Sequence, residues 1–201
     1  MKFAEKANKV FEEATELYHV TDDVDAPKPS PCTPGSVEAT LFDKNWIDAV
    51  QWHLEDIIRD PEIDPVEALA LKRRIDRSNQ DRTDMVEELD TYFRDLYKDV
   101  EVLSGARFNT ESPAWAFDRL SILVLKIYHM KAEIVRRDAS LEHKAKCNEK
   151  LEVLLQQRAD LMQAIDELLD DISSGHKYMR VYRQMKMYND PDTNPILYGG
   201  K

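Results

Sequence analysis

QDRTDMVEELD, residues 80–90, is matched by QQRADLMQAID at residues 156–166, with a constant offset of 76 positions. Both stretches read Gln-x-Arg-x-Asp, then two apolar residues, two others, one apolar residue and Asp. The same offset places Trp52-His53 on Tyr128-His129. We interpret the match as a degenerate duplication of one α-hairpin. The alternative is chance similarity between two charged amphipathic helices.

The residues around both stretches have helical periodicity and almost no strand signal. The sequence has five glycines, no Asn-Gly or Asp-Gly pair and no sustained two-residue alternation, which is typical of an all-α protein. Asp64-Pro65, with Glu67 placed to complete a capping box, predicts a helix start. Proline, glycine and capping residues together predict helices at about 42–59, 65–103, from 113 onward, and 140–173.

Two long hairpins therefore form the expected core of one helical-bundle domain, residues 41–201. They span residues 42–104 and 113–173, and we expect them to pair about a pseudo-twofold axis. Before them, residues 1–19 are expected to form an amphipathic N-terminal helix. Residues 20–40 contain four prolines, so we expect a linker or a strap lying over the bundle.

The C-terminal segment, residues 175–201, differs from the rest of the chain in charge. It has five Lys or Arg against two Asp, a net charge of +3, whereas the whole chain carries −11. We expect a basic helix at residues 176–188. Aromatic rings between cations favour stacking on a nucleotide, an RNA strand or a sugar phosphate; the alternative is docking on the acidic bundle through Val181, Tyr182 and Met185. The basic aromatic patch comprises Lys177, Tyr178, Arg180, Tyr182, Arg183 and Lys186.

Net charge, cysteine content and hydropathy exclude several functional classes. A charge of −11 disfavours general binding to nucleic acid or to an anionic membrane, because both repel such a surface. The two cysteines, Cys32 and Cys147, form neither a disulfide framework nor a CxxC motif. The longest apolar run, residues 120–125, is far shorter than the roughly 20 residues of a membrane span. We expect a reduced, cytoplasmic protein with no membrane span.

Two arginines fall on apolar helix faces and are the first candidates for function. Arg82 and Arg158 occupy equivalent positions in the repeat, and an unpaired buried guanidinium is costly, so a central polar layer with facing acceptors is expected. In one interpretation each arginine pairs with a carboxylate of a neighbouring helix and fixes the bundle register. In the other, both arginines form a phosphate or carboxylate pocket together with Asn79, His53 and His129.

A metal site is the second chemical possibility. An oxygen-only set of Glu55, Asp56, Asp84 and Glu88 suits Mg²⁺ or Mn²⁺ and would support hydrolysis of a phosphorylated small molecule, such as a nucleotide pyrophosphate. The alternative is that these carboxylates form a solvated face. Apart from that metal, no cofactor is expected.

Nucleophilic catalysis finds no support in the sequence. There is no Gly-x-Ser-x-Gly elbow and no phosphate-cradling glycine-rich loop. Cys147 lies among basic residues but has no assignable histidine partner. Whether the protein is an enzyme or a binding protein is left open at this point.

Four stretches of the sequence are distinctive: WHLEDIIRDP, KRRIDRSNQDRTDMVEELD, DRLSILVLKIYHM and VYRQMKMYNDPDTNP. Together they resemble a bacterial family, the domain of unknown function 4254. The resemblance would cover about residues 42–198, and it implies no established activity. This chain has Arg82-Thr83-Asp84 where Arg-Asn-Asp is common in the family, so asparagine-dependent contacts would be lost there.

The family is similar to proteins that occur beside sugar-transfer and lipopolysaccharide-assembly functions. This association implies an interaction or accessory protein linked to cell-envelope glycan synthesis, with a protein partner or a second copy of the chain. A phosphorylated or sugar-nucleotide ligand would fit the arginine pocket. The alternative function is the metal-dependent hydrolase of a phosphorylated small molecule.

Overall fold

The computed structural model describes residues 1–187 and 190–199, and this part of the chain is all-α, as predicted. The two strands within it, β1 and β2, are only two residues long each. A short helix, α6, lies near the C-terminus. The elements are α1 (Phe3–Thr21), α2 (Val37–Ile57), α3 (Pro65–Leu96), β1 (Arg107–Phe108), α4 (Pro113–Val135), α5 (Leu141–Ser173), β2 (Lys177–Tyr178) and α6 (Pro195–Tyr198).

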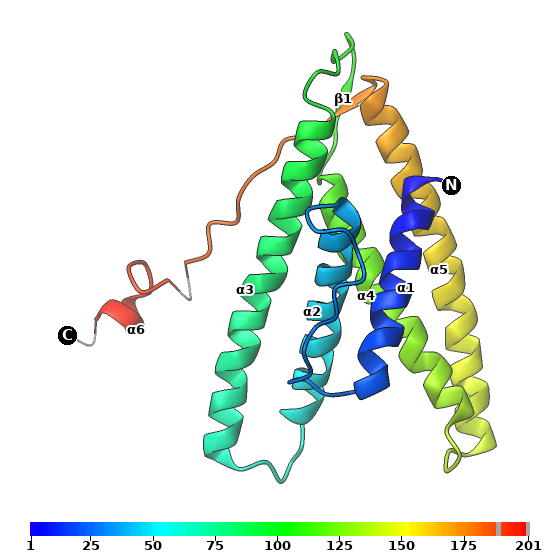
Figure 1. Cartoon of the computed structure of the whole chain (residues 1–201), viewed down its shortest axis with the longest axis vertical. Helices are drawn as coiled ribbons and strands as arrows, with labels where there is room; N and C mark the ends of the chain where they lie inside the picture. Colours follow the sequence, from blue (N-terminus) through cyan, green and yellow to red (C-terminus); the bar gives the residue numbers. More distant parts are fainter. Residues whose placement is uncertain (188–189, 200–201) are drawn as a thin grey trace.

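Two hairpins, α2–α3 and α4–α5, lie side by side with their first helices next to each other. Figure 1 shows α2 and α4 running in the same direction between α3 and α5, which do not contact one another. Positions separated by 76 meet where α2 and α4 face each other: Asn45 Nδ2 lies 3.0 Å from Ser121 Oγ, and the rings of His53 and His129 lie 5.4 Å apart. A pseudo-twofold axis between the hairpins requires such contacts, whereas the duplication itself stays an interpretation.

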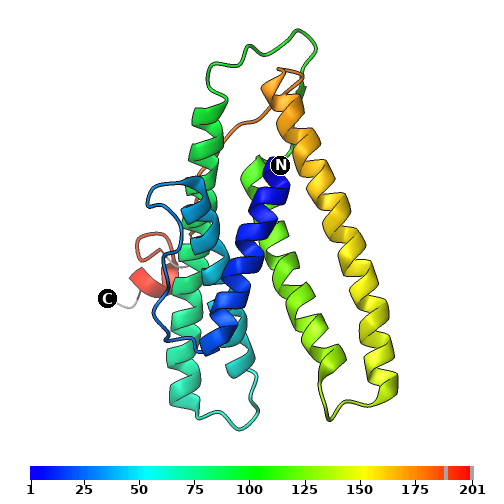
Figure 2. The same cartoon turned by 45° about the vertical axis from the view of Figure 1, so that its right-hand side comes forward.

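The N-terminal helix α1 belongs to the same core as the hairpins. It contacts α2, α4 and α5, and Figure 2 shows it lying between the two hairpins. Phe3 packs edge-on against Phe93 of α3 and Phe117 of α4, with ring centroids 5.5 and 5.3 Å away. Its first turn is capped from α5, because the backbone N–H of Ala4 donates to Asp166 Oδ1 at 3.1 Å. Burial of this face therefore ties α1 to both hairpins.

The strap between α1 and α2 is shorter than the predicted linker, residues 20–40. Helix α2 begins at Val37, because the Ser36 side chain caps it by accepting from the Ala39 N–H at 3.2 Å. Arg74 of α3 holds the strap through Asp25, at 2.8 Å. The segment thus crosses the bundle as an anchored strap.

Helix α3 starts at the predicted cap but ends seven residues early. Asp64 accepts from the backbone N–H groups two and three residues on, as the sequence predicts. The prediction that the helix continues to residue 103 is wrong, because the Leu103 N–H donates to the Gly175 carbonyl at 3.0 Å. A tertiary hydrogen bond has replaced a helical one. Gly175 has φ +75°, and a Cβ there would lie 2.2 Å from the Glu101 carbonyl oxygen, so only glycine fits.

The predicted basic helix at residues 176–188 is not formed in its described part, which ends at residue 187; residue 188 lies outside the described residues. Residues 177–178 instead pair in parallel with β1, and the following chain runs extended beside α3 (Figure 1). It docks through cations rather than apolar groups. Arg183 pairs with Glu87 at 3.0 Å, whereas Tyr182 and Met185 are exposed. An extended backbone lets its cations reach the acidic helix surface, and this contact overrides local helix propensity.

Candidate functional site

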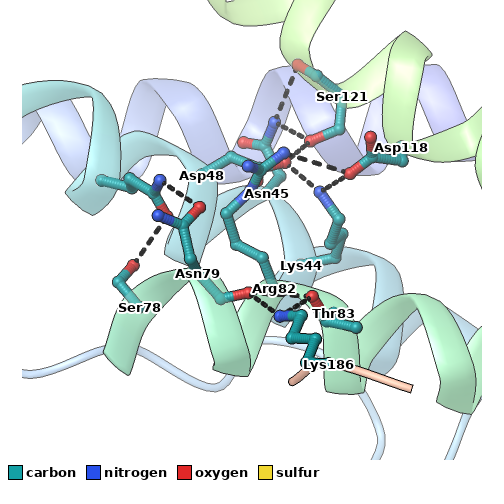
Figure 3. A network of polar contacts seen from close by, with 11 residues as sticks. Lys44, Asn45, Asp48, Ser78, Asn79, Arg82, Thr83, Asp118, Ser121 and Lys186 are labelled. Atoms are coloured by element: carbon teal, nitrogen blue, oxygen red, sulfur yellow. Dashed lines mark hydrogen bonds and ion pairs between the residues drawn. The ribbon is translucent and has the colours of Figure 1, made fainter. Parts of the chain in front are cut away.

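Arg82 finds the facing acceptors that its position requires, and they are carboxylates of the protein. Its Nε lies 2.5 Å from Asp48 Oδ1 on α2, and its Nη2 lies 3.2 Å from Asp118 Oδ1 on α4 (Figure 3). Lys44 of α2 contacts the same two carboxylates, with 2.8 Å to Asp118. Two cations and two carboxylates thus form a charge-balanced group, called here the charged network: Lys44, Asp48, Arg82 and Asp118.

The charged network is deeply buried and fully paired. The side chains of Lys44 and Asp48 are 0% exposed, and that of Arg82 is 24% exposed. Burial lowers the pKa of the Arg82 guanidinium, but the charges of Asp48 and Asp118 more than offset this and raise it overall. Ser121 Oγ donates to Asp48 Oδ2 at 2.6 Å. This arrangement matches the interpretation in which Arg82 fixes the register of three helices.

Asn79 lies beside the charged network but bonds elsewhere. Its side-chain oxygen accepts from Gln51 at 2.7 Å, and its carbonyl oxygen accepts from Lys186 of the tail at 3.3 Å (Figure 3). An open groove of about 320 Å³ there is lined by Asn79, Arg82, Trp115 and Lys186. An anion entering it would meet a guanidinium already shared between two carboxylates.

Arg158 does not join Arg82 in one polar layer. It lies on α5, and its Nη1 contacts Glu12 Oε1 of α1 at 2.5 Å. Because α3 and α5 do not contact each other, the two guanidinium groups belong to separate contacts. The expected shared layer is therefore replaced by two separate groups of ion pairs: Arg82 with Asp48 and Asp118, and Arg158 with Glu12 of α1.

The four carboxylates expected to hold Mg²⁺ or Mn²⁺ do not converge. Among the described residues, no three oxygens of this set lie within 4.8 Å of one another. Glu55 pairs with Arg59 on its own helix at 3.1 Å, Asp84 accepts from Gln80 at 2.8 Å, and Glu88 accepts from Thr40 at 2.8 Å. Asp56 is exposed near the end of α2.

Three histidines from three different helices meet near the ends of α1 and α2. His19 lies in the last turn of α1, His53 in α2 and His129 in α4. One ring nitrogen of each lies within 4.8 Å of the other two, and His19 Nε2 and His53 Nε2 are 3.2 Å apart. We call His19, His53 and His129 the histidine cluster. The repeat offset predicts the approach of His53 and His129, and His19 completes the group.

The orientation of His19 directs its Nε2 into the cluster, where it can accept from His53 or coordinate an ion. Its Nδ1 lies 2.6 Å from the Thr15 carbonyl oxygen, which can only accept, so the proton of a neutral ring sits on Nδ1. Its Nε2 then faces the cluster as a lone pair. Metal-bound histidines typically carry this outer-shell bond to a carbonyl, because it fixes the tautomer and the ring orientation.

Aromatic side chains hold all three rings in place. His19 stacks on Tyr128 at 4.0 Å, His129 stacks on Trp52 at 4.7 Å with planes 8° apart, and His53 stacks on Tyr18 at 5.1 Å. Stacking covers the face of each imidazole ring, so the ring nitrogens at its edge stay available for contacts in the ring plane. The ring positions are therefore set by the core.

Two residues of the histidine cluster, His19 and His129, have a lowered pKa. Burial, together with the neighbouring rings of His19 and His53, lowers the pKa of His129 to about 4. Burial also lowers the pKa of His19, although the bond to the Thr15 carbonyl opposes this. His129 Nε2 is buried without a hydrogen-bond partner. Neutral imidazoles with available lone pairs are the form in which histidine binds metal.

Zinc and similar transition-metal ions fit this donor set. Zn–N bonds of about 2.0–2.1 Å in tetrahedral geometry place nitrogens about 3.3 Å apart, close to the 3.2 Å between His19 and His53. Asp22 stands at the rim: its Oδ1 is 3.6 Å from His53 Nε2 and its side chain is 60% exposed. It caps α1 in a left-handed conformation, with φ 51°. A carboxylate is thus available beside the three nitrogens.

The cations of the basic aromatic patch all contact other parts of the protein, and two of them, Lys177 and Arg183, pair with carboxylates. Lys177 pairs with Asp171 at 2.9 Å, and the Arg180 guanidinium lies over the Phe108 ring at 5.6 Å. Tyr178 also packs against Phe108, with ring centroids 5.2 Å apart. Arg183 and Lys186 bond to α3, as described above. The segment thus lies against the bundle, but through charged and polar groups; the expected contacts of Tyr182 and Met185 are not formed, since both side chains are exposed.

Sequence reasoning missed several residues of these two groups. Lys44 and Asp48 are four apart on an apolar helix face, and this spacing was the available signal. For His19 the signal is the Glu-x-x-His spacing of residues 16–19. Neither pattern shows which helix faces it, because that depends on how α1 and α2 pack.

The fold and the site define an all-α protein with a histidine cluster that joins its N-terminal helix to two hairpins. The chain belongs to the family described as "Protein of unknown function (DUF4254)", whose model matches residues 38–181. The resemblance seen in the sequence is thereby confirmed, although the match ends earlier than residue 198. Helix α1, with His19, precedes it. No curated protein and no solved structure matches the chain.

The helices also bear on the membrane prediction. Within residues 1–187 and 190–199, none combines the length and the apolar character needed to cross a bilayer.

Proposed function

We propose that the protein binds a transition-metal ion of the zinc type through His19, His53 and His129. The observation that carries this is the convergence of three histidine ring nitrogens from three helices, one of them oriented by a carbonyl. Nitrogen ligands select Zn²⁺ and its neighbours over Mg²⁺, which prefers oxygen. The metal differs for this reason from the Mg²⁺ or Mn²⁺ expected for a carboxylate set.

Hydrolysis is the reaction that such a centre supports best. Zinc sites with three protein ligands keep a fourth position for water, whose pKa falls to about 7 when it is bound. In this chain Asp22, whose Oδ1 is 3.6 Å from His53 Nε2, would be the residue to accept a proton from such a water or to serve as a fourth ligand. The hydrolase of a phosphorylated small molecule is thus kept as the enzymatic proposal. The link to cell-envelope glycan synthesis and the cytoplasmic setting stay predictions.

Metal binding is tested by counting zinc ions on the chelator-treated full chain. We expect His53→Ala to bind one zinc fewer than the unmodified protein, and His176→Ala, at an exposed position, to bind the same number. Zinc at about a hundredfold excess over its Kd should stabilise the fold by about 2.7 kcal/mol, and His53→Ala should lose that gain. Equal zinc contents in the unmodified chain and His53→Ala would overturn the proposal.

Hydrolysis is tested separately, with p-nitrophenyl phosphate and p-nitrophenyl acetate as probes. We expect zinc-dependent turnover that His53→Ala abolishes. If Asp22 moves the proton, Asp22→Asn should lower kcat while leaving zinc affinity nearly unchanged; if Asp22 is the fourth ligand, zinc affinity should fall instead. Zinc binding without turnover of either probe would discard the hydrolase and keep the metal site.

A further inference from the structure

A second group of potential metal ligands lies at the tip of the α4–α5 hairpin. Glu133 is in the last turns of α4, and His143 and Cys147 are one turn apart at the start of α5. One donor atom of each lies within 4.8 Å of the other two. We call Glu133, His143 and Cys147 the hairpin-tip group. The sequence interpretation that Cys147 has no histidine partner is therefore wrong, since His143 is four residues away on the same helix face.

The geometry of the hairpin-tip group does not suit nucleophilic catalysis. His143 Nε2 lies 2.8 Å from Glu133 Oε2 and 3.3 Å from Cys147 Sγ. In a nucleophilic relay the thiol and the carboxylate contact opposite nitrogens of the ring. Here both face the same nitrogen, which carries either one proton or one lone pair. The three donors converge on one point instead of forming a chain.

A metal ion satisfies this convergence better than hydrogen bonds do. If the His143 Nε2 carries a proton and donates it to Glu133, the Cys147 thiol has no acceptor on that nitrogen. If the Nε2 instead carries a lone pair and accepts from the thiol, that lone pair lies next to the carboxylate oxygen of Glu133 and repels it. An ion between the three would accept from all of them at once. Sulfur, nitrogen and carboxylate oxygen are together a donor set for Zn²⁺, with bonds of about 2.0–2.3 Å, whereas Mg²⁺ and Ca²⁺ take oxygen ligands.

Burial and local structure prepare the group for an ion that enters from solvent. Cys147 is 5% exposed, whereas the side chains of His143 and Glu133 are 43% and 37% exposed and form the mouth. Ser140 caps α5 by accepting from the His143 backbone N–H at 3.1 Å, which fixes the start of the helix. Arg136 lies 3.2 Å from Glu133 and orients its carboxylate.

We propose that Glu133, His143 and Cys147 form a second metal site, of the zinc type, that clamps the tip of the α4–α5 hairpin. On binding, the Cys147 thiol loses its proton to the buffer and coordinates as thiolate, with His143 neutral and Glu133 ionised. This site shares no residue with the histidine cluster: Glu133 lies one turn beyond His129 on α4, and its carboxylate contacts His143 of α5. All three ligands lie inside residues 38–181, the part that matches the family model.

The test uses Co²⁺ in place of Zn²⁺, because a cobalt–thiolate bond gives a near-ultraviolet charge-transfer band. The starting protein is the full chain with Cys32→Ser and His53→Ala, so that Cys147 is the one thiol and the histidine cluster is disabled. We expect a band that saturates at one cobalt per chain. Zinc should slow alkylation of Cys147 by iodoacetamide about tenfold or more.

Single changes in this background identify the ligands. Cys147→Ser should abolish the band, and Glu133→Gln and His143→Ala should each weaken cobalt binding by more than about tenfold. Glu142→Gln is the matched control, because Glu142 is exposed on the same turn and pairs with Lys146. Far-ultraviolet circular dichroism checks that each variant is folded.

Two results would overturn the proposal. One is the absence of a thiolate band at saturating cobalt in the folded starting protein. The other is a band whose cobalt affinity is unchanged by both Glu133→Gln and His143→Ala. Either result leaves the histidine cluster untouched, because His53→Ala has already removed it from this experiment.

Discussion

The charged network and the histidine cluster both join α2 to α4, but they differ in how their polar atoms are satisfied. In the charged network every charge has an opposite charge from the protein, and Lys44 and Asp48 are completely buried. In the histidine cluster the Nε2 of His129 has no hydrogen-bond partner, and the Nε2 atoms of His19 and His53 face each other. The first arrangement is complete without a ligand, whereas the second would be completed by the cation proposed above. Polar burial alone therefore does not mark a binding site.

The largest expected effect is that of breaking the charged network. Asp48→Ala leaves Lys44 and Arg82 with one carboxylate between them inside the core. We expect a loss of about 3–5 kcal/mol in the free energy of unfolding, measured by urea denaturation. Asp76→Ala, which breaks the exposed Lys72–Asp76 pair, should cost less than about 1 kcal/mol. Similar losses in the two variants would mean that the network is not structural.

The histidine cluster should make stability depend on pH below neutrality in the metal-free protein. Below pH 6.5 the unfolded chain protonates His129, whereas the folded protein does so only near pH 4. Unfolding then takes up a proton, so the free energy of unfolding should fall as the pH falls from 6.5 to 4, by up to about 3 kcal/mol. The lowered pKa of His19 adds to the fall.

Denaturation in chelator across this pH range measures the effect. His129→Phe keeps a ring against Trp52 but removes the titrating nitrogens, so the slope should flatten. The exposed variant His176→Gln serves as the control. A slope that is unchanged in His129→Phe would contradict the burial of a neutral His129.

The smallest effect on stability is expected for the contacts of the extended segment after β2, which reaches Asn79 and Thr83 beside the charged network. Lys186 Nζ donates to Thr83 Oγ1 at 2.7 Å and to the Asn79 carbonyl, at a partly exposed position. Lys186→Ala should therefore lower the free energy of unfolding by less than about 1 kcal/mol. Urea denaturation beside Arg183→Ala, the neighbouring tail contact, checks this. A loss as large as that of Asp48→Ala would make the tail part of the network.

Local signals predicted the helices well and failed where distant segments meet. Asp64-Pro65 starts α3 and Pro113 starts α4 because caps and prolines act within a few residues. The predictions for the end of α3 and for residues 176–187 were wrong, because contacts between distant segments decide both. These contacts are the Leu103–Gly175 backbone hydrogen bond, the pairing of β1 with β2, and the Arg183–Glu87 ion pair. Such contacts depend on packing, which periodicity does not encode.

The candidate sites show the same difference between local signals and contacts that depend on packing. The apolar surroundings of Arg82 predicted facing acceptors, but only the packing of α2 and α4 identifies Asp48 and Asp118. The repeat offset predicted that His53 and His129 approach each other. His19 depends on the placement of α1, whose partner helices no local pattern identifies.

The strap of residues 22–36 links α1 covalently to α2. Docking of α1 on the hairpins is therefore an intramolecular event, in which the effective concentration of α1 is high. One histidine of the cluster is on α1 and two are on the hairpins, so an undocked α1 would leave only a two-nitrogen site. By linkage, a metal that binds the cluster as proposed raises the population in which α1 is closed over the core, and closure raises metal affinity by the same factor. The concentration of available zinc would thereby set the fraction of molecules in which α1 is docked on the hairpins.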